Sequence, residues 1–121
     1  MIEADIRTAL LGSSAVVSIV EERIAALTMP EGEPAPYVVY QLVAGNREGS
    51  MVSGGCLRNG RFQLSCFSND YLQAKALAEA VQNAIDDYEG FASVFISDRD
   101  LQDPTTKLYY VVLEYSIWQD T

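Results

Sequence analysis

The sequence contains no histidine and only 8 lysine and arginine residues in 121. Without histidine, the chain lacks the commonest general base and the commonest side-chain metal ligand of proteins. The 17 acidic residues give a formal net charge of −9, which opposes a surface built to bind nucleic-acid phosphates. No serine or cysteine has a histidine to activate it. We therefore expect no enzyme activity, no catalytic residues, no metal site and no cofactor.

Cysteines and long apolar runs are also scarce. Cys56 and Cys66 lie ten positions apart, a spacing that fits neither a CxxC redox motif nor a zinc knuckle, so we expect two reduced thiols, one of them buried. No apolar run approaches the roughly twenty residues that span a bilayer. Met1 leads directly into an acidic segment rather than into a secretion signal. We expect a soluble protein that is not secreted and has no membrane partner.

The sequence contains enough apolar residues for one folded domain over residues 1–121, since 49% of them are hydrophobic. Helical spacing of apolar residues predicts a helix over 2–11 that ends at Gly12. One or two helical turns follow over 15–20, then a short strand near 23–27. Three prolines in 28–36 predict a loop, because proline cannot continue a ladder of backbone hydrogen bonds.

The second part of the chain alternates strands with one long helix. Residues 37–44 are apolar on both faces, so we expect that strand to be covered on each side, and residues 61–67 alternate cleanly. Ser68 or Asn69 can cap a helix that follows, in which Lys75 and Glu79 are spaced to pair on the wet side. Residues 92–99 and 107–118 are the last strands. The order of these helices and strands along the chain predicts an α+β fold: a mostly antiparallel four- to five-stranded sheet with two main helices packed on one face.

The last strand is apolar on both faces. Its core face is predicted to carry Tyr109, Val111, Leu113, Tyr115 and Ile117. The opposite face carries Tyr110, Val112 and Trp118, and two helices cannot cover both faces of the sheet. These three side chains are either scattered surface residues or a candidate subunit interface, because exposed apolar patches often meet another protein.

The stretch Gly45 to Gly55, "GNREGSMVSGG", resembles a phosphate-binding loop only in its glycines. It has neither the Walker spacing nor the dinucleotide spacing, and a strand rather than a helix follows it. Because it joins two strands expected to pair, we predict that it projects from the end of the sheet. It is either a disordered surface loop or an arm that orders on assembly. In the second case the candidate contact residues are Arg47, Glu48, Ser50, Met51 and Val52.

Three aspartates in the segment "SDRDLQDP" could be imagined around a divalent cation. Asp98, Asp100 and Asp103 lack the glycine and the terminal glutamate of an EF-hand loop, and Arg99 lies among them. An acidic turn before Pro104 is the favoured interpretation.

The order of the pieces resembles the tail-completion, or tail-terminator, proteins of long-tailed bacteriophages and prophages. The resemblance covers nearly the whole chain, through "IRTALLGSSAVVSIVEERI", "PAPYVVYQLV", "GRFQLSCFSNDYLQAKALAEAVQNAID" and "DRDLQDPTTKLYYVVLEYSI". It implies an α+β fold with helices on a mostly antiparallel sheet. It also implies subunits that associate as a ring, typically of six, on the end of the tail tube, where they stop its polymerisation and meet the neck or head connector.

The resemblance further implies the partners and the place of the protein. These are other copies of the chain in a hexameric ring, the tail tube protein and a neck or head-completion protein, in the virion tail or neck after assembly in the host cytoplasm. Six copies at −9 each give −54, so we expect DNA to pass through the channel without specific binding. The alternatives are another neck or minor tail component, an enzyme that acts through the acidic turn, and a small-ligand module.

Overall fold

The computed structural model describes residues 1–49 and 56–120, and their side chains over 1–45 and 58–119. In these described residues three helices and five strands follow one another as α1 (Ile2–Leu11), α2 (Ser14–Val20), β1 (Ile24–Ala26), β2 (Tyr37–Gly49), β3 (Cys56–Ser68), α3 (Tyr71–Asp87), β4 (Ala92–Gln102) and β5 (Tyr109–Asp120). The predicted α+β class is confirmed.

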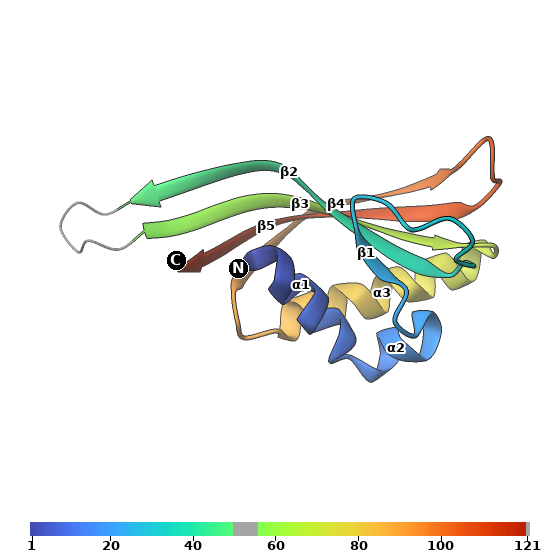
Figure 1. The fold of residues 1–121 in the computed structure, drawn as a ribbon, viewed down its shortest axis with the longest axis horizontal. Helices are drawn as coiled ribbons and strands as arrows, with labels where there is room; N and C mark the ends of the chain where they lie inside the picture. The colour runs from blue at the N-terminus through green and yellow to red at the C-terminus, as the bar shows by residue number, and fades with distance from the viewer. Residues whose placement is uncertain (50–55, 121) are drawn as a thin grey trace.

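The strands form one sheet in the order β1-β2-β3-β5-β4. Only β1 and β2 run parallel, and the other neighbours are antiparallel. All three helices lie on the same side of this sheet (Figure 1). The two main helices of the prediction, α1 and α3, are therefore joined on that face by the shorter α2, and no helix of the described residues lies on the other face.

The core lies between the helices and the sheet because each element has one apolar face. On β3, Phe62, Leu64 and Cys66 alternate inward as predicted and are fully buried. The predicted inner face of β5 is buried too, apart from Tyr109, which packs against the edge of the core. The helices contribute apolar residues at helical spacing, namely Ile2, Ile6, Ala9 and Leu10 from α1, Val16 and Val20 from α2, and Ala74, Leu77, Ala78, Val81 and Ile85 from α3.

The start of α3 differs from the prediction. Its N-cap is Asp70, whose carboxylate accepts a hydrogen bond from the Gln73 backbone N–H at 3.3 Å. The hydroxyl of Ser68 accepts from the Asp70 N–H and donates to the Gln73 side chain, so it orders the approach to the helix instead of capping it. Three polar residues in a row each suit a cap, and the turn before the helix selects the third.

Strands β2 and β3 are longer than predicted. The pairing of β2 and β3 continues through Gly45↔Gly60, Asn46↔Asn59 and Arg47↔Arg58 to Gly49↔Cys56. Glycine and asparagine indicate a turn in a sequence, but the ladder is made by backbone groups, and a paired backbone can stay extended without apolar side chains. The prediction of a loop over Gly45 to Cys56 is therefore wrong for residues 45–49 and for Cys56. Residues 50–55 lie outside the described residues.

The outer face of β2 also differs from the expectation of cover on both sides. Tyr37 and Val39 point away from the helices and are half-buried. Among the described residues no helix lies on that face, and Phe67 of the neighbouring strand β3 stacks on Tyr37.

Candidate assembly surface

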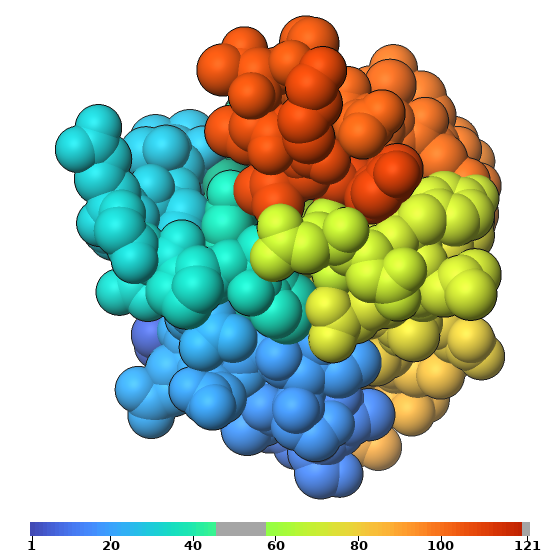
Figure 2. All heavy atoms as spheres, turned by 90° about the vertical axis from the view of Figure 1, so that its right-hand side faces the viewer, coloured from blue at the N-terminus to red at the C-terminus, as the bar shows by residue number. Residues whose placement is uncertain are grey.

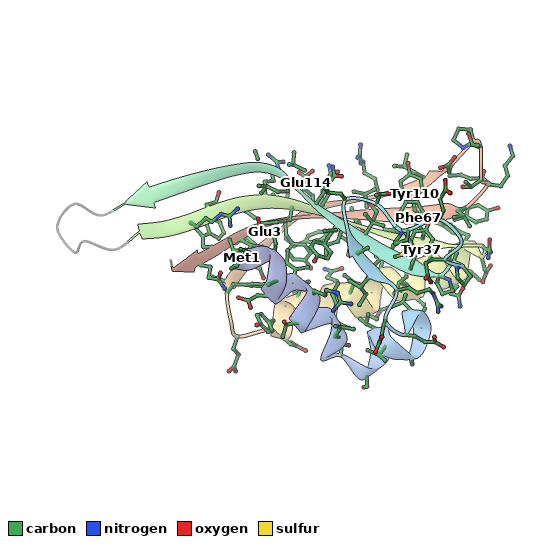
Figure 3. The ribbon with its side chains drawn as sticks, viewed as in Figure 1. Met1, Glu3, Tyr37, Phe67, Tyr110 and Glu114 are labelled. Carbon is green, nitrogen blue, oxygen red and sulfur yellow. The ribbon has the colours of Figure 1, made fainter. Side chains whose placement is uncertain are left out.

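The helix-free face of the sheet carries a row of aromatic rings. Tyr37, Phe67 and Tyr110 stand at matching positions on β2, β3 and β5. The ring centroids of Tyr37 and Phe67 are 5.0 Å apart, those of Phe67 and Tyr110 are 4.7 Å apart, and both pairs are stacked. Figure 3 shows the three residues together at one end of the sheet. We call Tyr37, Phe67, Tyr110 and their β4 neighbour Leu101, which pairs with Tyr110, the aromatic row.

The structure separates the three residues of the predicted subunit interface. Tyr110 is a half-buried member of the aromatic row, whereas Val112 is only 6% exposed and offers a partner almost no surface. Trp118 lies on the same face but eight residues further along β5, about 27 Å away. There it lines a shallow hollow with Met1, Phe91 and Ala92. Sequence reasoning missed Tyr37 and Phe67, because only the strand register places them beside Tyr110.

Polar side chains fill the middle of the helix-free face. Glu114 on β5 accepts hydrogen bonds from Arg61 Nε at 2.8 Å and from Gln63 Nε2 at 3.2 Å, both on β3. The bonds from Gln63 and then from Arg61 hold the pKa of Glu114 below its ordinary value. Asn59 donates to the Ser116 hydroxyl at 2.9 Å. The face is therefore apolar at the aromatic row and charged at its centre, where Figure 3 places Glu114.

The far end of the β2–β3 hairpin projects beyond the helices (Figure 1). We call this part, residues 45–49 and 56–60, the arm. Its residues belong to the sheet, so the projecting part is a paired hairpin rather than the predicted loop. Arg47 and Glu48 lie on its β2 strand, while Ser50, Met51 and Val52 lie outside the described residues.

An ion pair ties the base of the arm to α1. Arg58 on β3 donates two hydrogen bonds to Glu3, at 3.0 Å and 2.9 Å. Burial by itself raises the pKa of Glu3. The hydrogen bonds and charge of Arg58, a backbone hydrogen bond and the N-terminal ammonium group together outweigh burial and hold that pKa below its ordinary value. The cross-strand neighbour of Arg58 on β2 is Arg47.

Two aspartates of the predicted acidic turn, Asp100 and Asp103, make hydrogen bonds and an ion pair within the fold. Asp100 accepts a hydrogen bond from the Tyr71 hydroxyl at 2.6 Å and pairs with Lys75 at 3.0 Å. Asp103 accepts from the backbone N–H groups of Thr105 and Thr106, which closes the turn between β4 and β5. The prediction that Lys75 pairs with Glu79 is wrong, because β4 brings Asp100 closer to the ammonium group. Figure 2 looks onto this end of the molecule, where the turn lies above the start of α3.

Cys66 is a free, fully buried thiol, and burial raises its pKa well above the ordinary value. A thiol in this state is unreactive. Among the described residues, no group of three or more histidine, cysteine, aspartate or glutamate side chains is arranged to hold a metal ion. Nor does any helix of that part of the chain have the length and apolar character that a bilayer crossing requires.

Comparison with known protein families identifies the family of this chain. The family described as "Tail completion protein gp17" matches residues 4–120. The chain belongs to this family. Members of the tail completion family are structural proteins of phage tails, so the predicted resemblance is confirmed, and the projecting arm and helix-free face are surfaces of a virion component.

One solved structure illustrates how far the fold of this tail completion family member is shared. A chain from "Virion of native gene transfer agent (GTA) particle" superposes with a TM-score of 0.72 at 16% sequence identity. The match covers 96% of this chain and 92% of that chain. At such low identity the similarity shows a common fold. A search of curated proteins gave no match.

Proposed function

We propose that the protein forms a ring, of six copies, at the head-proximal end of the tail tube. The ring terminates polymerisation of the tube and provides the surface to which the neck or head-completion protein joins. The observation that carries this proposal is the family match over residues 4–120. The protein acts by contact and has no catalytic role, in line with a sequence that lacks histidine.

Apolar surface left over after the core is made supports an assembly role. The aromatic row occupies a sheet face without a helix, and its members Tyr110, Phe67 and Tyr37 are half-buried. Aromatic side chains are enriched where proteins meet, because they bury large areas at low entropic cost. We propose that Tyr110 and Trp118, at the two ends of this face, contact other proteins of the assembled tail.

The arm is the second proposed contact. It carries Arg47 and Glu48 for polar contacts, with Met51 and Val52 following in the sequence as adaptable apolar residues. Met51→Asp, or deletion of residues 48–54, should leave the rest of the protein folded but abolish tail completion. Infectious particles at wild-type yield from either variant would refute a role for the arm.

Tail length distinguishes the terminator from its rival, a neck or minor tail component. Electron microscopy of lysates from a deletion of this gene should show overlong tails, because nothing would stop the tube from growing. Tails of normal length that fail to join heads would assign the protein to the neck instead.

A pair of tyrosine variants tests the aromatic row in the same assay. Tyr110→Ser removes one ring from the row, and Tyr71→Ser removes an exposed ring from α3, on the other side of the sheet. We expect the first variant to fail in restoring tails to the deletion strain and the second to restore them. Equal restoration by both would exclude the row as a contact.

A further inference from the structure

The two sides of the sheet end in unpaired strand edges. On one side β4 forms the edge over its whole length, Ala92 to Gln102. On the other side β1 pairs with β2 only at Val38 to Tyr40, so from Gln41 onward no strand among the described residues pairs with the edge of β2 that faces away from β3. Unpaired backbone N–H and C=O groups in an extended strand are a template for another strand.

Both free edges carry apolar side chains in contact with solvent. On β4, Val94 is 54%, Phe95 37% and Ile96 40% exposed. On β2, Leu42 is 38% and Val43 48% exposed. Large apolar side chains side by side on a sheet edge are unusual in a monomer and mark a place where another chain binds.

The exposed apolar residues of the two edges lie at the same level of the sheet. Following the register across β3 and β5, Leu42 is in the row of Phe95, and Ala44 is in the row of Val94. The bulged residues Val43 and Ile96 flank the row of Leu42 and Phe95, one on each side of it.

The charged part of β4 lies at a different level. Asp98, Arg99 and Asp100 are in the rows of Tyr40, Val39 and Val38, which are the three β2 residues covered by β1. The edge of β4 is thus charged at the level where the opposite edge is blocked, and uncharged over Ala92 to Ser97, where the opposite edge is open. Charges are a common means of preventing strand pairing.

Strand directions suit a head-to-tail contact. β4 runs antiparallel to β5, β5 to β3 and β3 to β2, so β4 is antiparallel to β2 within one molecule. A second copy placed beside the first without being turned over therefore presents its β2 antiparallel to the first copy's β4. The alternation of strand directions continues across the contact, and the interface uses two different surfaces, as a closed ring requires.

We propose that the subunits join by pairing the β4 edge, residues 92–97, with the β2 edge, residues 41–46, of the next copy. This inference rests on the proposed ring and identifies the contact between its subunits. We call this contact, residues 92–97 of one copy and 41–46 of the next, the seam. When the ring axis runs along the strands, rotation from copy to copy keeps each row at its level, so Val94 meets Ala44 and Phe95 meets Leu42 of the neighbour. The arm and the aromatic row then lie at opposite rims of the ring.

Disulfide trapping in assembled tails tests the seam. Val94→Cys with Ala44→Cys, and Ser97→Cys with Gln41→Cys, each place two cysteines in one row on the helix-free face. Both pairs are made in a Cys56→Ser chain, and Cys66 is retained because it is buried. On mild oxidation of tails that contain the variants, each pair should yield a ladder of linked subunits that ends at the ring number. Tails that contain the protein but give no ladder from either pair overturn the seam and leave the terminator role standing.

Single-cysteine variants separate the seam from a symmetric contact. Val94→Cys alone should give no linked species, whereas a β4-to-β4 contact would give dimers and contradict the proposal. As a second measurement, Val94→Asp should lower incorporation into tails by about 30-fold or more, because a charge would be buried in the seam. The matched control Leu72→Asp, at the exposed start of α3, should incorporate normally. Normal incorporation of Val94→Asp would overturn the seam, while tail length in the deletion strain tests termination separately.

Discussion

Gly60 is the residue at which one methyl group would disturb the base of the arm. A Cβ at this position would lie 2.4 Å from Cε2 of Phe62, which is fully buried and cannot move aside. Its cross-strand partner Gly45 has room, since a Cβ there would come no closer than 3.4 Å to Leu42. Of these two paired glycines, Gly60 is therefore required by packing, whereas Gly45 is not.

We predict that Gly60→Ala lowers the free energy of unfolding by about 1–3 kcal/mol, the usual cost of overpacking. Gly45→Ala should change it by less than about 1 kcal/mol, because a side chain in an extended strand also reduces the freedom of the unfolded chain. Urea denaturation of both variants measures the difference. Equal loss in the two would contradict the packing argument.

The elements show what sequence patterns could and could not predict. The inner faces of β3, β5 and α3 follow from periodicity alone, because burial on one side imposes a period of two or 3.6 on the sequence. The ends of β2 and β3 do not, since the glycines and asparagines that suggest a turn at 45–46 are held extended by the partner strand. Only part of the aromatic row could be predicted from the sequence. The alternation of β5 places Tyr110 on the outer face, but the positions of Phe67 and Tyr37 beside it depend on the strand register.

The cap of α3 gives a prediction at the same scale. Asp70→Ala should destabilise the protein by about 1 kcal/mol, because the Gln73 N–H loses its acceptor and the helix dipole loses a favourable charge. Asn69→Ala, one residue earlier, makes the control and should change stability by less than half as much. Thermal unfolding of both variants measures the two losses of stability. A larger loss in the Asn69 variant would show that Asn69, not Asp70, caps the helix.

The ion pair between Glu3 and Arg58 links α1 to the arm and should depend on pH. The pKa of Glu3 is lowered in the folded protein, so its contribution is fully present above the ordinary pKa of 4.5 and is lost as the pH falls through the folded value. Glu3→Gln should increase hydrogen exchange of the arm amides at neutral pH. The same change at the exposed Glu79 of α3 should not, and unchanged exchange in the Glu3 variant would contradict the link.

At the scale of the whole molecule, the sheet is an elongated layer with different features at its ends and sides. The arm projects past α1 at one end, and the aromatic row stands near the other (Figures 1 and 3). The free edges of β2 and β4 form the two sides. In the proposed ring, the sides join neighbouring copies and the ends face the tube and the neck. A net charge of −9 per chain should keep DNA from adhering to the channel of that proposed ring.

The central claim is that this protein stops a tail tube from growing, and growth can be watched directly. Purified tail tube protein is allowed to polymerise with and without this protein, and tube lengths are measured by electron microscopy. We predict that tubes stop elongating once the protein is added and carry a ring at one end. Tubes that keep growing at the same rate, with the protein present in excess, would contradict the account.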